Sequence, residues 1–232
     1  MPGIAELTLG EIAIECPGAA PVFEKYRMDY GCGGRRRFLD ACLQAGLDPA
    51  GIEAEIAASE SNPAESKPWK AAPLQALIRH LVEVDHPCIR KGLIDLDRAL
   101  VKSAVAASLQ RALSRLTREL NLHLDREDAM VFPVIVRLEA AREANAVFPR
   151  PVFGSVRHPI WMMEQEHRKA AAILDEALVL ARQDAPGGAD RDALRSFRES
   201  LDAFEIRIYR NFHLENNILY PRAARLEQEA TA

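Results

Sequence analysis

Residues 123–127 read His-Leu-Asp-Arg-Glu and are followed by Phe132-Pro133, while residues 211–215 read Asn-Phe-His-Leu-Glu and are followed by Tyr220-Pro221. In both stretches a glutamate precedes an aromatic residue by five positions and a proline by six. Residues four apart lie on one helix face, so each copy can direct two side chains at one point. Imidazole and carboxylate groups suit a first-row metal such as iron. Two copies therefore indicate two halves of one helical bundle that share a metal centre.

The sequence around both copies has the apolar spacing of long helices. Steps that alternate between four and three run through Leu109, Leu113, Leu116, Leu120, His123, Glu127, Met130 and Val134, and again through Leu194, Phe197, Leu201, Phe204, Ile208, Asn211, Glu215 and Ile218. Such a seam faces other helices. Further amphipathic stretches at 74–101 and 160–181 complete a predicted all-α, hemerythrin-like up-down-up-down four-helix bundle. Pro133 and Pro221 are expected near the ends of the second and fourth helices.

Residues 1–57 have the signals of a small domain of short helices. Thr8-x-x-Glu11 is a capping box, and Asp48-Pro49 provides a cap and a first-turn proline for the last of these helices. A turn with three glycines at 29–34 contains Cys32 and precedes an apolar stripe of Phe38, Leu39, Cys42 and Leu43. The segment is therefore expected to fold as a helical, cysteine-containing domain.

Proline-rich segments mark the expected boundaries. Residues 58–73 combine prolines with small polar residues and are expected to form a linker, which leaves residues 74–232 for the bundle and its metal centre. Pro149–Pro151 and Asp184–Gly188 are expected to connect consecutive helices of the bundle.

Composition narrows the class of protein. The 232 residues carry a net charge of −4, which gives no reason to expect nucleic acid as a partner. No apolar run reaches the length of a membrane span, and the N-terminal residues lack the features of a signal peptide. A cytoplasmic location is therefore expected, with reduced thiols at Cys16, Cys32, Cys42 and Cys88.

Polar residues in the apolar seams point to the metal site. They are His86 on the first long helix, His123 and Glu127 on the second, His167 on the third, and Asn211 and Glu215 on the fourth. A buried imidazole or carboxylate is costly without a partner. A single seam histidine such as His86 is more often a hydrogen-bonded core residue, but contributions from four helices favour a bound metal. Iron is favoured over zinc, because structural zinc sites are usually rich in cysteine.

The other three histidines are expected outside the ligand set. His80 is six residues before His86 and faces away from it, and His158 lies at the start of the third long helix. His213 is about 160° from Asn211 and Glu215 on an ideal helix. It is therefore expected either to support a ligand or to lie at the surface, unless the helix bulges there.

Taken together, these motifs resemble the repair-of-iron-centres family, which consists of hemerythrin-like di-iron proteins that respond to nitrosative and oxidative damage. The resemblance covers nearly the whole chain and is carried by Thr8–Glu11, Val22–Tyr26, Met28–Gly34, His86, the pair His123 and Glu127, Glu166-His167 and His213–Pro221. It implies two iron ions with His86, His123, Glu127, His167 and Glu215 as ligands. Glu127 and Glu215 would bridge the two ions.

The chain departs from the family pattern at two positions. The family has histidine four residues before the last glutamate, where this chain has Asn211, a weaker oxygen donor at the expected sixth ligand position. One iron is then more open to a small ligand or more easily lost, and His213 could substitute after a local shift. Many relatives have a second cysteine at Gly31, so chemistry that needs a vicinal thiol pair is not predicted.

Cys32 supports two interpretations. It lies in a glycine-rich turn before Arg35, Arg36 and Arg37 and an expected helix start. Positive charge and a helix N-terminus lower the pKa of a thiol, which would make Cys32 reactive and a candidate catalytic residue. Alternatively, the cysteine only packs in a tight turn.

The resemblance implies a protein of nitrosative stress or denitrification. Its small ligand would be nitric oxide, and damaged iron-sulfur proteins would be its partners. Two other activities fit the same residues: reduction of nitric oxide, and the binding or sensing of oxygen. Whether the protein is an enzyme stays open, with binding and repair favoured over rapid turnover. The apolar faces of the N-terminal domain also allow a homodimer.

Overall fold

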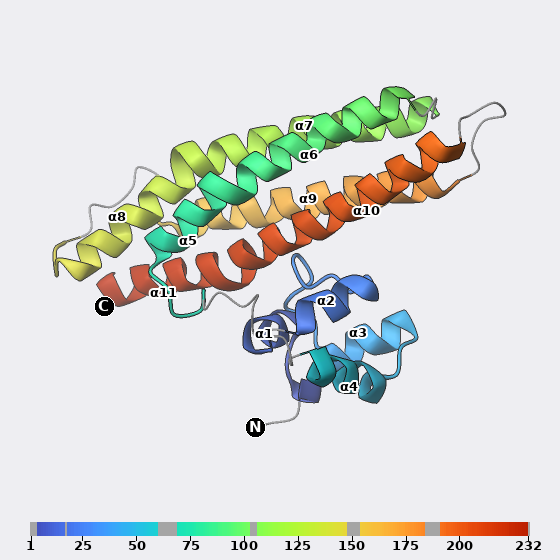
Figure 1. Cartoon of the computed structure of the whole chain (residues 1–232). Coiled ribbons are helices and arrows are strands. Elements are labelled where there is room, and N and C mark those ends of the chain that lie inside the picture. The colour runs from blue at the N-terminus through green and yellow to red at the C-terminus, as the bar shows by residue number, and fades with distance from the viewer. Residues whose placement is uncertain are drawn as a thin grey trace. The chain divides into compact units, whose positions relative to one another are not determined.

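The computed structural model describes residues 4–16, 18–59, 69–102, 106–147, 154–183 and 191–231. It confirms the all-α helical bundle fold, because these residues contain no β-strand. The elements are η1 (Ile4–Glu6), α1 (Leu9–Glu15), α2 (Ala19–Lys25), α3 (Phe38–Ala45), α4 (Pro49–Ser59), α5 (Leu74–His80), η3 (Leu81–Asp85), α6 (His86–Lys102), α7 (Ala107–Arg126), η4 (Glu127–Val131), α8 (Phe132–Glu143), α9 (Arg157–Arg182), α10 (Arg191–His213), η5 (Leu214–Leu219) and α11 (Tyr220–Thr231) (Figure 1). Residues 60–68, which make up most of the expected linker, lie outside the described residues, as do Pro149–Pro151 and Asp184–Gly188.

Two compact units make up the chain. One consists of Met1–Pro73 together with Tyr209–Arg222, and the other of Leu74–Ile208 together with Ala223–Ala232. None of the described helices has the length and apolar character needed to cross a bilayer.

The first unit has its own apolar core, which contains the buried rings of Phe23, Tyr30 and Phe38. The expected capping box is present at α1: the Thr8 backbone N–H donates to Glu11 Oε2 at 2.8 Å, and the Glu11 N–H donates to Thr8 Oγ1 at 3.3 Å. The Thr8 hydroxyl also donates to Glu11 Oε2, at 2.9 Å. The hydrogen bond from the Thr8 backbone, as the larger cause, and the one from its hydroxyl lower the pKa of the Glu11 carboxyl. Asp48 also caps α4 as expected, because its side chain accepts the N–H of Gly51 at 3.0 Å.

The apolar stripe expected on α3 is only partly correct. Phe38 and Cys42 are fully buried, but Leu39 is 46% exposed and Leu43 is 81% exposed. The helix is eight residues long and turns a narrow face, completed by Ala41, toward the core. A single narrow stripe is sufficient for a short helix that packs on one side.

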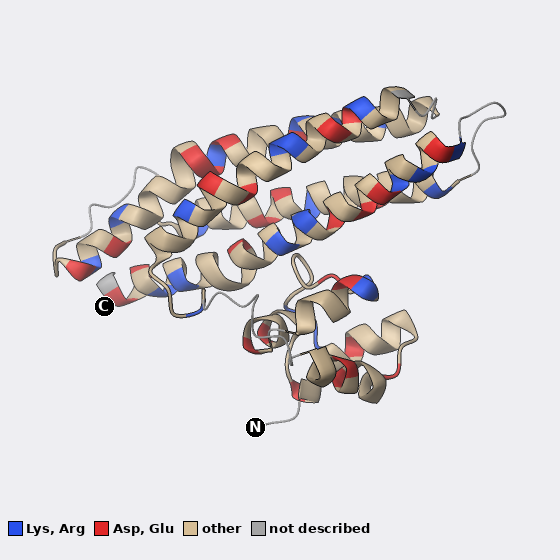
Figure 2. Cartoon of the chain, viewed as in Figure 1, with Lys and Arg blue, Asp and Glu red and all other residues tan. Residues whose placement is uncertain are grey.

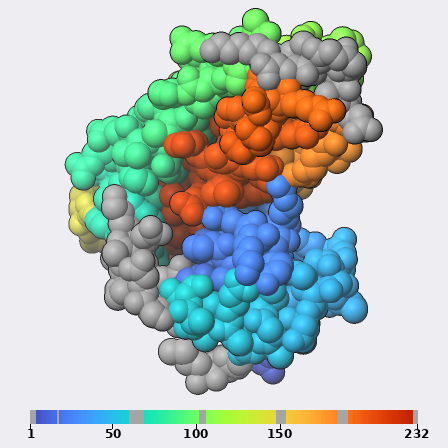
Figure 3. All heavy atoms as spheres, turned by 45° about the vertical axis from the view of Figure 1, so that its right-hand side comes forward, coloured from blue at the N-terminus to red at the C-terminus, as the bar shows by residue number. Residues whose placement is uncertain are grey.

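In the second unit, consecutive long helices run in opposite directions (Figure 1). The helices α6 and α10 lie side by side in two views (Figures 1 and 3). Gly92 permits this approach, because a Cβ atom there would lie 2.7 Å from Cδ2 of Phe204. Residues of both charge signs are mixed along these helices (Figure 2).

Two carboxylates distant in sequence cap the starts of long helices. Glu139 accepts the backbone N–H groups of Leu74 and Gln75 at 2.6 and 2.7 Å. Glu227 accepts the N–H of Val156 at 2.9 Å. Each carboxylate satisfies donors that have no partner within the first turn of a helix, so the starts of α5 and α9 are fixed by charge-assisted hydrogen bonds.

The prolines of the repeated pattern do not end their helices, so that expectation is wrong. Pro133 and Pro221 lie in the first turns of α8 and α11, which continue to Glu143 and Thr231. A π-helical turn precedes each proline, η4 in the first case and η5 in the second. A proline ring in an α-helix clashes with the carbonyl four residues earlier. We infer that the wider turn relieves this clash and lets the helix continue.

The π turns also change which residues face the core. Met130, expected in the apolar seam, lies within η4 and is 55% exposed, whereas its neighbour Val131 is 2% exposed. Val82 lies within η3 and is 37% exposed. One extra residue in a turn rotates the helix that follows by about 100°, because an α-helix has 3.6 residues per turn. A seam drawn for an uninterrupted α-helix therefore misplaces Met130 within η4, whereas Val134, beyond this turn, is buried as expected.

Candidate metal centre

Four of the predicted ligands lie close together at the centre of the bundle. His123, Glu127, His167 and Glu215 each offer one ligand atom, and these atoms all lie within 4.8 Å of one another. The four residues are at most 2% exposed. The Nε2 atoms of His123 and His167 are 2.8 Å apart. Nitrogen and carboxylate donors that converge in a buried volume can coordinate a transition metal.

Glu127 lies between the histidines of three helices. Its Oε2 is 3.3 Å from Nε2 of His123 and 3.6 Å from Nε2 of His86, and its Oε1 is 3.7 Å from Nε2 of His167. Burial raises the pKa of the Glu127 carboxyl, but the imidazoles beside it have the greater combined effect and lower this pKa below its ordinary value. The Glu127 carboxyl is therefore ionised, and its negative charge interacts with three imidazole groups.

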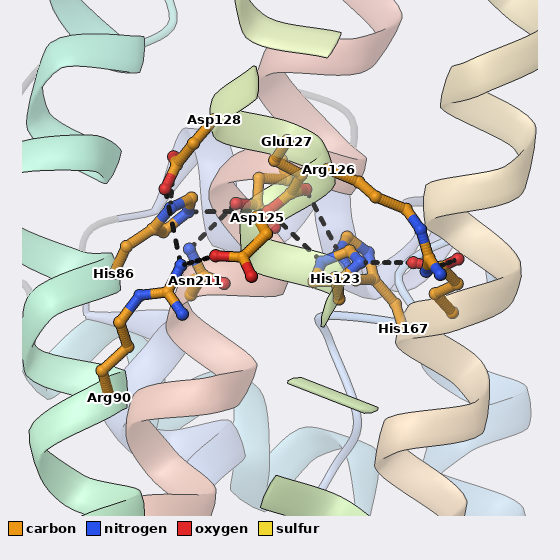
Figure 4. Close-up of polar contacts among 11 residues, drawn as sticks. His86, Arg90, His123, Asp125, Arg126, Glu127, Asp128, His167 and Asn211 are labelled. Carbon is orange, nitrogen blue, oxygen red and sulfur yellow. Dashed lines mark hydrogen bonds and ion pairs between the residues drawn. The ribbon is translucent and has the colours of Figure 1, made fainter. Parts of the chain in front are cut away.

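A carboxylate outside the centre orients His123. Its Nδ1 is 3.0 Å from Oε2 of Glu166, and Oε1 of Glu166 accepts from Nη1 of Arg126 at 2.5 Å (Figure 4). Such a carboxylate fixes the ring and keeps the proton on Nδ1. The Nε2 atom then presents its lone pair to the centre, as a metal ligand requires.

His86 is oriented in the same way. It is 1% exposed, and its Nδ1 is 2.8 Å from Oδ1 of Asp128, whose other oxygen is 3.6 Å from Arg90. Its ring stacks on Phe132, with the ring centroids 5.6 Å apart. The Nε2 atom, on the other side of the ring, therefore faces Glu127.

Asn211 completes the set of six expected positions. Its Nδ2 donates to Oε1 of Glu215 at 3.0 Å, and the side chain is 2% exposed. The Oδ1 atom is buried and has no hydrogen-bond partner among the residues that the structure describes. A buried acceptor without a donor is costly, and a cation would satisfy it. Three imidazoles, two carboxylates and one amide oxygen together fit iron.

The ligands lie next to the π turns. The backbone N–H of Phe132 donates to the carbonyl of Glu127, and that of Tyr220 donates to the carbonyl of Glu215. The N–H of His86 closes the turn η3 on the carbonyl of Leu81. Turns of this type frequently occur at functional sites, and here three of them adjoin predicted ligands.

His213 does not lie at the surface, so that alternative is wrong. It is 8% exposed, its Nδ1 is 2.9 Å from Nδ2 of Asn217, and its ring centroid is 5.3 Å from that of Tyr30. Burial lowers the pKa of His213 to about 4, so the ring is neutral near pH 7. The first unit contains all three residues, and the N-terminal segment therefore covers this face of the helix.

Of the remaining histidines, His158 lies near the start of the third long helix as expected, and the direction of His80 relative to His86 stays a prediction. His158 is exposed near the start of α9, and Nε2 of His80 is 3.6 Å from Oδ1 of Asp85. Neither residue belongs to the cluster of four ligands.

Cys32 is half-buried in the glycine-rich turn and forms no disulfide. Its backbone N–H donates to Oδ1 of Asp29 at 2.8 Å. Two side chains of η5 hold the same turn: Asn217 Nδ2 donates to the carbonyl of Tyr30 at 2.8 Å, and Asn216 Nδ2 donates to the carbonyl of Gly31 at 3.2 Å. The backbone next to Cys32 is therefore fixed from two sides.

Sequence reasoning assigned no supporting role to the residues that hold the predicted ligands and the Cys32 turn. They are Asp128 and Arg90 beside His86, Glu166 and Arg126 beside His123, and Asn216 and Asn217 beside the Cys32 turn. A usable signal was present for some of them, because Asp128 directly follows Glu127 and Glu166 directly precedes His167. Two adjacent asparagines inside a helix are also unfavourable unless their side chains have partners.

Comparison with known proteins adds independent information. A family described as a domain of unknown function (DUF542) matches residues 5–60. The iron-sulfur cluster repair protein YtfE of Musicola paradisiaca (strain Ech703) is 31% identical over 230 residues, which cover 96% of this chain and 98% of that protein. The protein of the same name from Yersinia pseudotuberculosis serotype O:1b (strain IP 31758) is 28% identical over 232 residues, which cover 95% of this chain and 97% of that protein.

Proposed function

Because the chain belongs to the repair-of-iron-centres family, we propose that it is a cytoplasmic di-iron protein that binds nitric oxide and helps to restore damaged iron-sulfur clusters. The observation that carries this proposal is the buried cluster of His123, Glu127, His167 and Glu215. The names of the relatives, which are iron-sulfur cluster repair proteins, support the repair activity.

The six polar side chains would hold two iron ions. His123 and His167 would serve one ion and His86 and Asn211 the other, while Glu127 and Glu215 would bridge them. When bound, the iron pair would supply one-electron redox chemistry and open positions for a diatomic molecule.

The protein's own residues set the conditions for that chemistry. Asp128 and Glu166 keep protons on the outer nitrogens of His86 and His123. Leu120 and Met163, each one turn from a histidine ligand, are buried and help to exclude water. A small uncharged gas loses little hydration on entering such a volume, which supports nitric oxide or oxygen as the ligand.

The N-terminal segment favours repair over oxygen carriage. A simple oxygen carrier has no need of a second unit, whereas residues 5–60 here match a family of their own. We assign Cys32 as the thiol that would take part in repair, as a thiolate ligand that passes iron to an acceptor. Reduction of nitric oxide remains the alternative activity, and it differs in requiring sustained turnover.

Reactivation of a damaged enzyme tests the repair activity. An iron-sulfur hydratase inactivated by nitric oxide is incubated under anaerobic conditions with the iron-loaded protein, and its recovered activity is measured. We expect recovery with the iron-loaded protein and little with the iron-free protein or with the Glu127→Ala variant. Equal recovery in all three samples would contradict the proposal.

Gas titration tests the ligand. The ferrous protein is titrated with nitric oxide while the absorbance spectrum is recorded, and nitrous oxide is measured in the headspace. We expect stoichiometric uptake. Continuous formation of nitrous oxide would favour the reductase instead, and a stable adduct with oxygen but none with nitric oxide would favour an oxygen-binding protein.

A further inference from the structure

The two copies of the repeated pattern provide different donors at the same place. Four residues before its glutamate, the first copy has His123 and the second has Asn211. Both residues are 2% exposed. The difference therefore concerns two equally buried positions and not a ligand that has moved to the surface.

One set of donors is complete without the asparagine. His123, His167, Glu127 and Glu215 already bring two nitrogens and two oxygens within 4.8 Å of one another. Two imidazoles with carboxylate oxygens form a donor set that binds iron well. The carboxylate of Glu166 further increases the basicity of His123.

The second set of donors consists of His86 and Asn211, and only His86 is a strong donor. His86 is held by Asp128 and lies 3.6 Å from Glu127, but it is not part of the cluster of four. Asn211 can add only a neutral amide oxygen, which is a harder and weaker donor to iron than imidazole. Its Oδ1 atom is buried and has no hydrogen-bond partner among the described residues, so it is available as a ligand.

We propose that this protein binds its two metal ions with unequal affinity: it retains the ion assigned to His123 and His167 and exchanges the ion assigned to His86 and Asn211. This inference depends on the proposed function for the presence of iron at the site. The exchangeable ion is then the one that the protein can give up to an acceptor, while the retained ion keeps the buried carboxylates neutralised.

The size of the difference follows from ligand chemistry. Loss of a residue that merely supports a ligand lowers metal affinity about 10- to 100-fold. Replacing a ligand by a weaker donor should have at least the larger of these effects. We therefore expect the two dissociation constants to differ by about 100-fold or more.

Competition with a chelator tests the proposal. The whole protein is equilibrated with ferrous iron under anaerobic conditions against graded concentrations of a ferrous chelator, and iron per chain is counted. The wild type should lose its iron in two separate steps of one ion each. In Asn211→His both ions should be retained to similar chelator concentrations, and in Asn211→Leu the weaker step should disappear while the stronger one remains.

Histidine variants provide a matched comparison. His86→Asn should abolish only the weaker step, whereas the same change at the exposed His158 should alter neither. Circular dichroism verifies that each variant is folded. Loss of both wild-type ions in one step, or one ion per chain at every iron concentration, would overturn the inference and leave iron binding intact. A wild type that binds no iron would instead contradict the proposed function.

Discussion

The two copies of the pattern, at residues 123–133 and 211–221, have a common backbone design and different chemistry. In each, a glutamate accepts the N–H of the aromatic residue five positions later, and a proline follows. The first copy has a histidine supported by Glu166 and Arg126. The second has an asparagine whose amide donates to Glu215. The two copies thus share the same backbone hydrogen bond, while the side chains at the predicted ligand positions differ.

The surroundings of the copies differ as well. In the second copy, Asn216 and Asn217 hold the backbone of the Cys32 turn, and Gly10 and Gly34 allow Asn217 to approach closely. In the first copy, the neighbouring polar groups support the ligand itself. This comparison teaches that the polar groups around the first copy orient predicted ligands, whereas those of the second copy also anchor the N-terminal segment.

The largest effects are expected where the copies are equivalent. Glu127→Ala and Glu215→Ala should each weaken iron binding by more than about 100-fold. Each should also remove the stabilisation that iron provides to the folded state, about 3 to 4 kcal/mol at 100 to 1,000 times the dissociation constant. Iron per chain and chemical unfolding with and without iron measure this. Glu176→Ala, at an exposed ion pair with Arg115, is the control, and unchanged iron in both variants would contradict the bridging role.

A smaller change makes the copies alike. His123→Asn gives the first copy the donor of the second, so the affinity for the retained ion should fall by about 100-fold, toward that of the exchangeable ion. The chelator titration should then show one weak step in place of two. If the strong step persists, His123 is not the residue that distinguishes the halves.

Substitution of the two carboxylates that support histidine ligands should distinguish the two metal positions through smaller effects. Glu166→Gln should weaken only the retained ion, and Asp128→Asn only the exchangeable ion, each by about 10-fold. Asp125→Asn is a close control, because Asp125 pairs with Arg90 at 2.8 Å but its side chain is 67% exposed and it is not a partner of a predicted ligand. The measurement is again the position of each step in the chelator titration. Equal effects of the two variants on both steps would argue against separate positions.

The smallest effect on metal is expected in the N-terminal segment. An added Cβ at Gly34 would meet the side chain of Asn217 and lie 2.8 Å from the carbonyl of Tyr30. Gly34→Ala should therefore lower the free energy of unfolding by about 1 to 3 kcal/mol and leave the strong iron step unchanged. Gly51→Ala, in the first turn of α4, should change stability by less than about 1 kcal/mol. Urea unfolding measures both, and loss of the strong step in Gly34→Ala would show that anchoring and metal binding are not separable.

Much of the helical architecture could be predicted from the sequence, because its signals are local. The capping box at Thr8 and the cap at Asp48 depend on hydrogen bonds over three residues, and both are present. The long helices follow from the spacing of their apolar residues, and this spacing does not depend on how the loops are built.

The exposure of Met130, which lies within the π turn η4, could not be predicted. A proline inside a helical pattern usually marks the end of the helix or a kink, but Pro133 and Pro221 each follow a π turn within a helix that continues. Met130 was misplaced for this reason. For His213 the sequence left two alternatives, and the surface alternative is wrong because the N-terminal segment contacts its ring through Tyr30, a residue 183 positions away. Helical periodicity contains no information about such a contact.

The three π turns give each of three long helices a fixed angular offset part-way along its length, at the level where the polar side chains gather. Proline has no amide hydrogen, so the residues after Phe132 and Tyr220 cannot slide back into the regular register. Removing one residue from such a turn would restore a regular α-helix. It would also rotate the residues that follow the turn, so that their buried side chains would no longer face the core. In this protein, length changes that most exposed loops would tolerate are therefore expected to be forbidden in the middle of its helices.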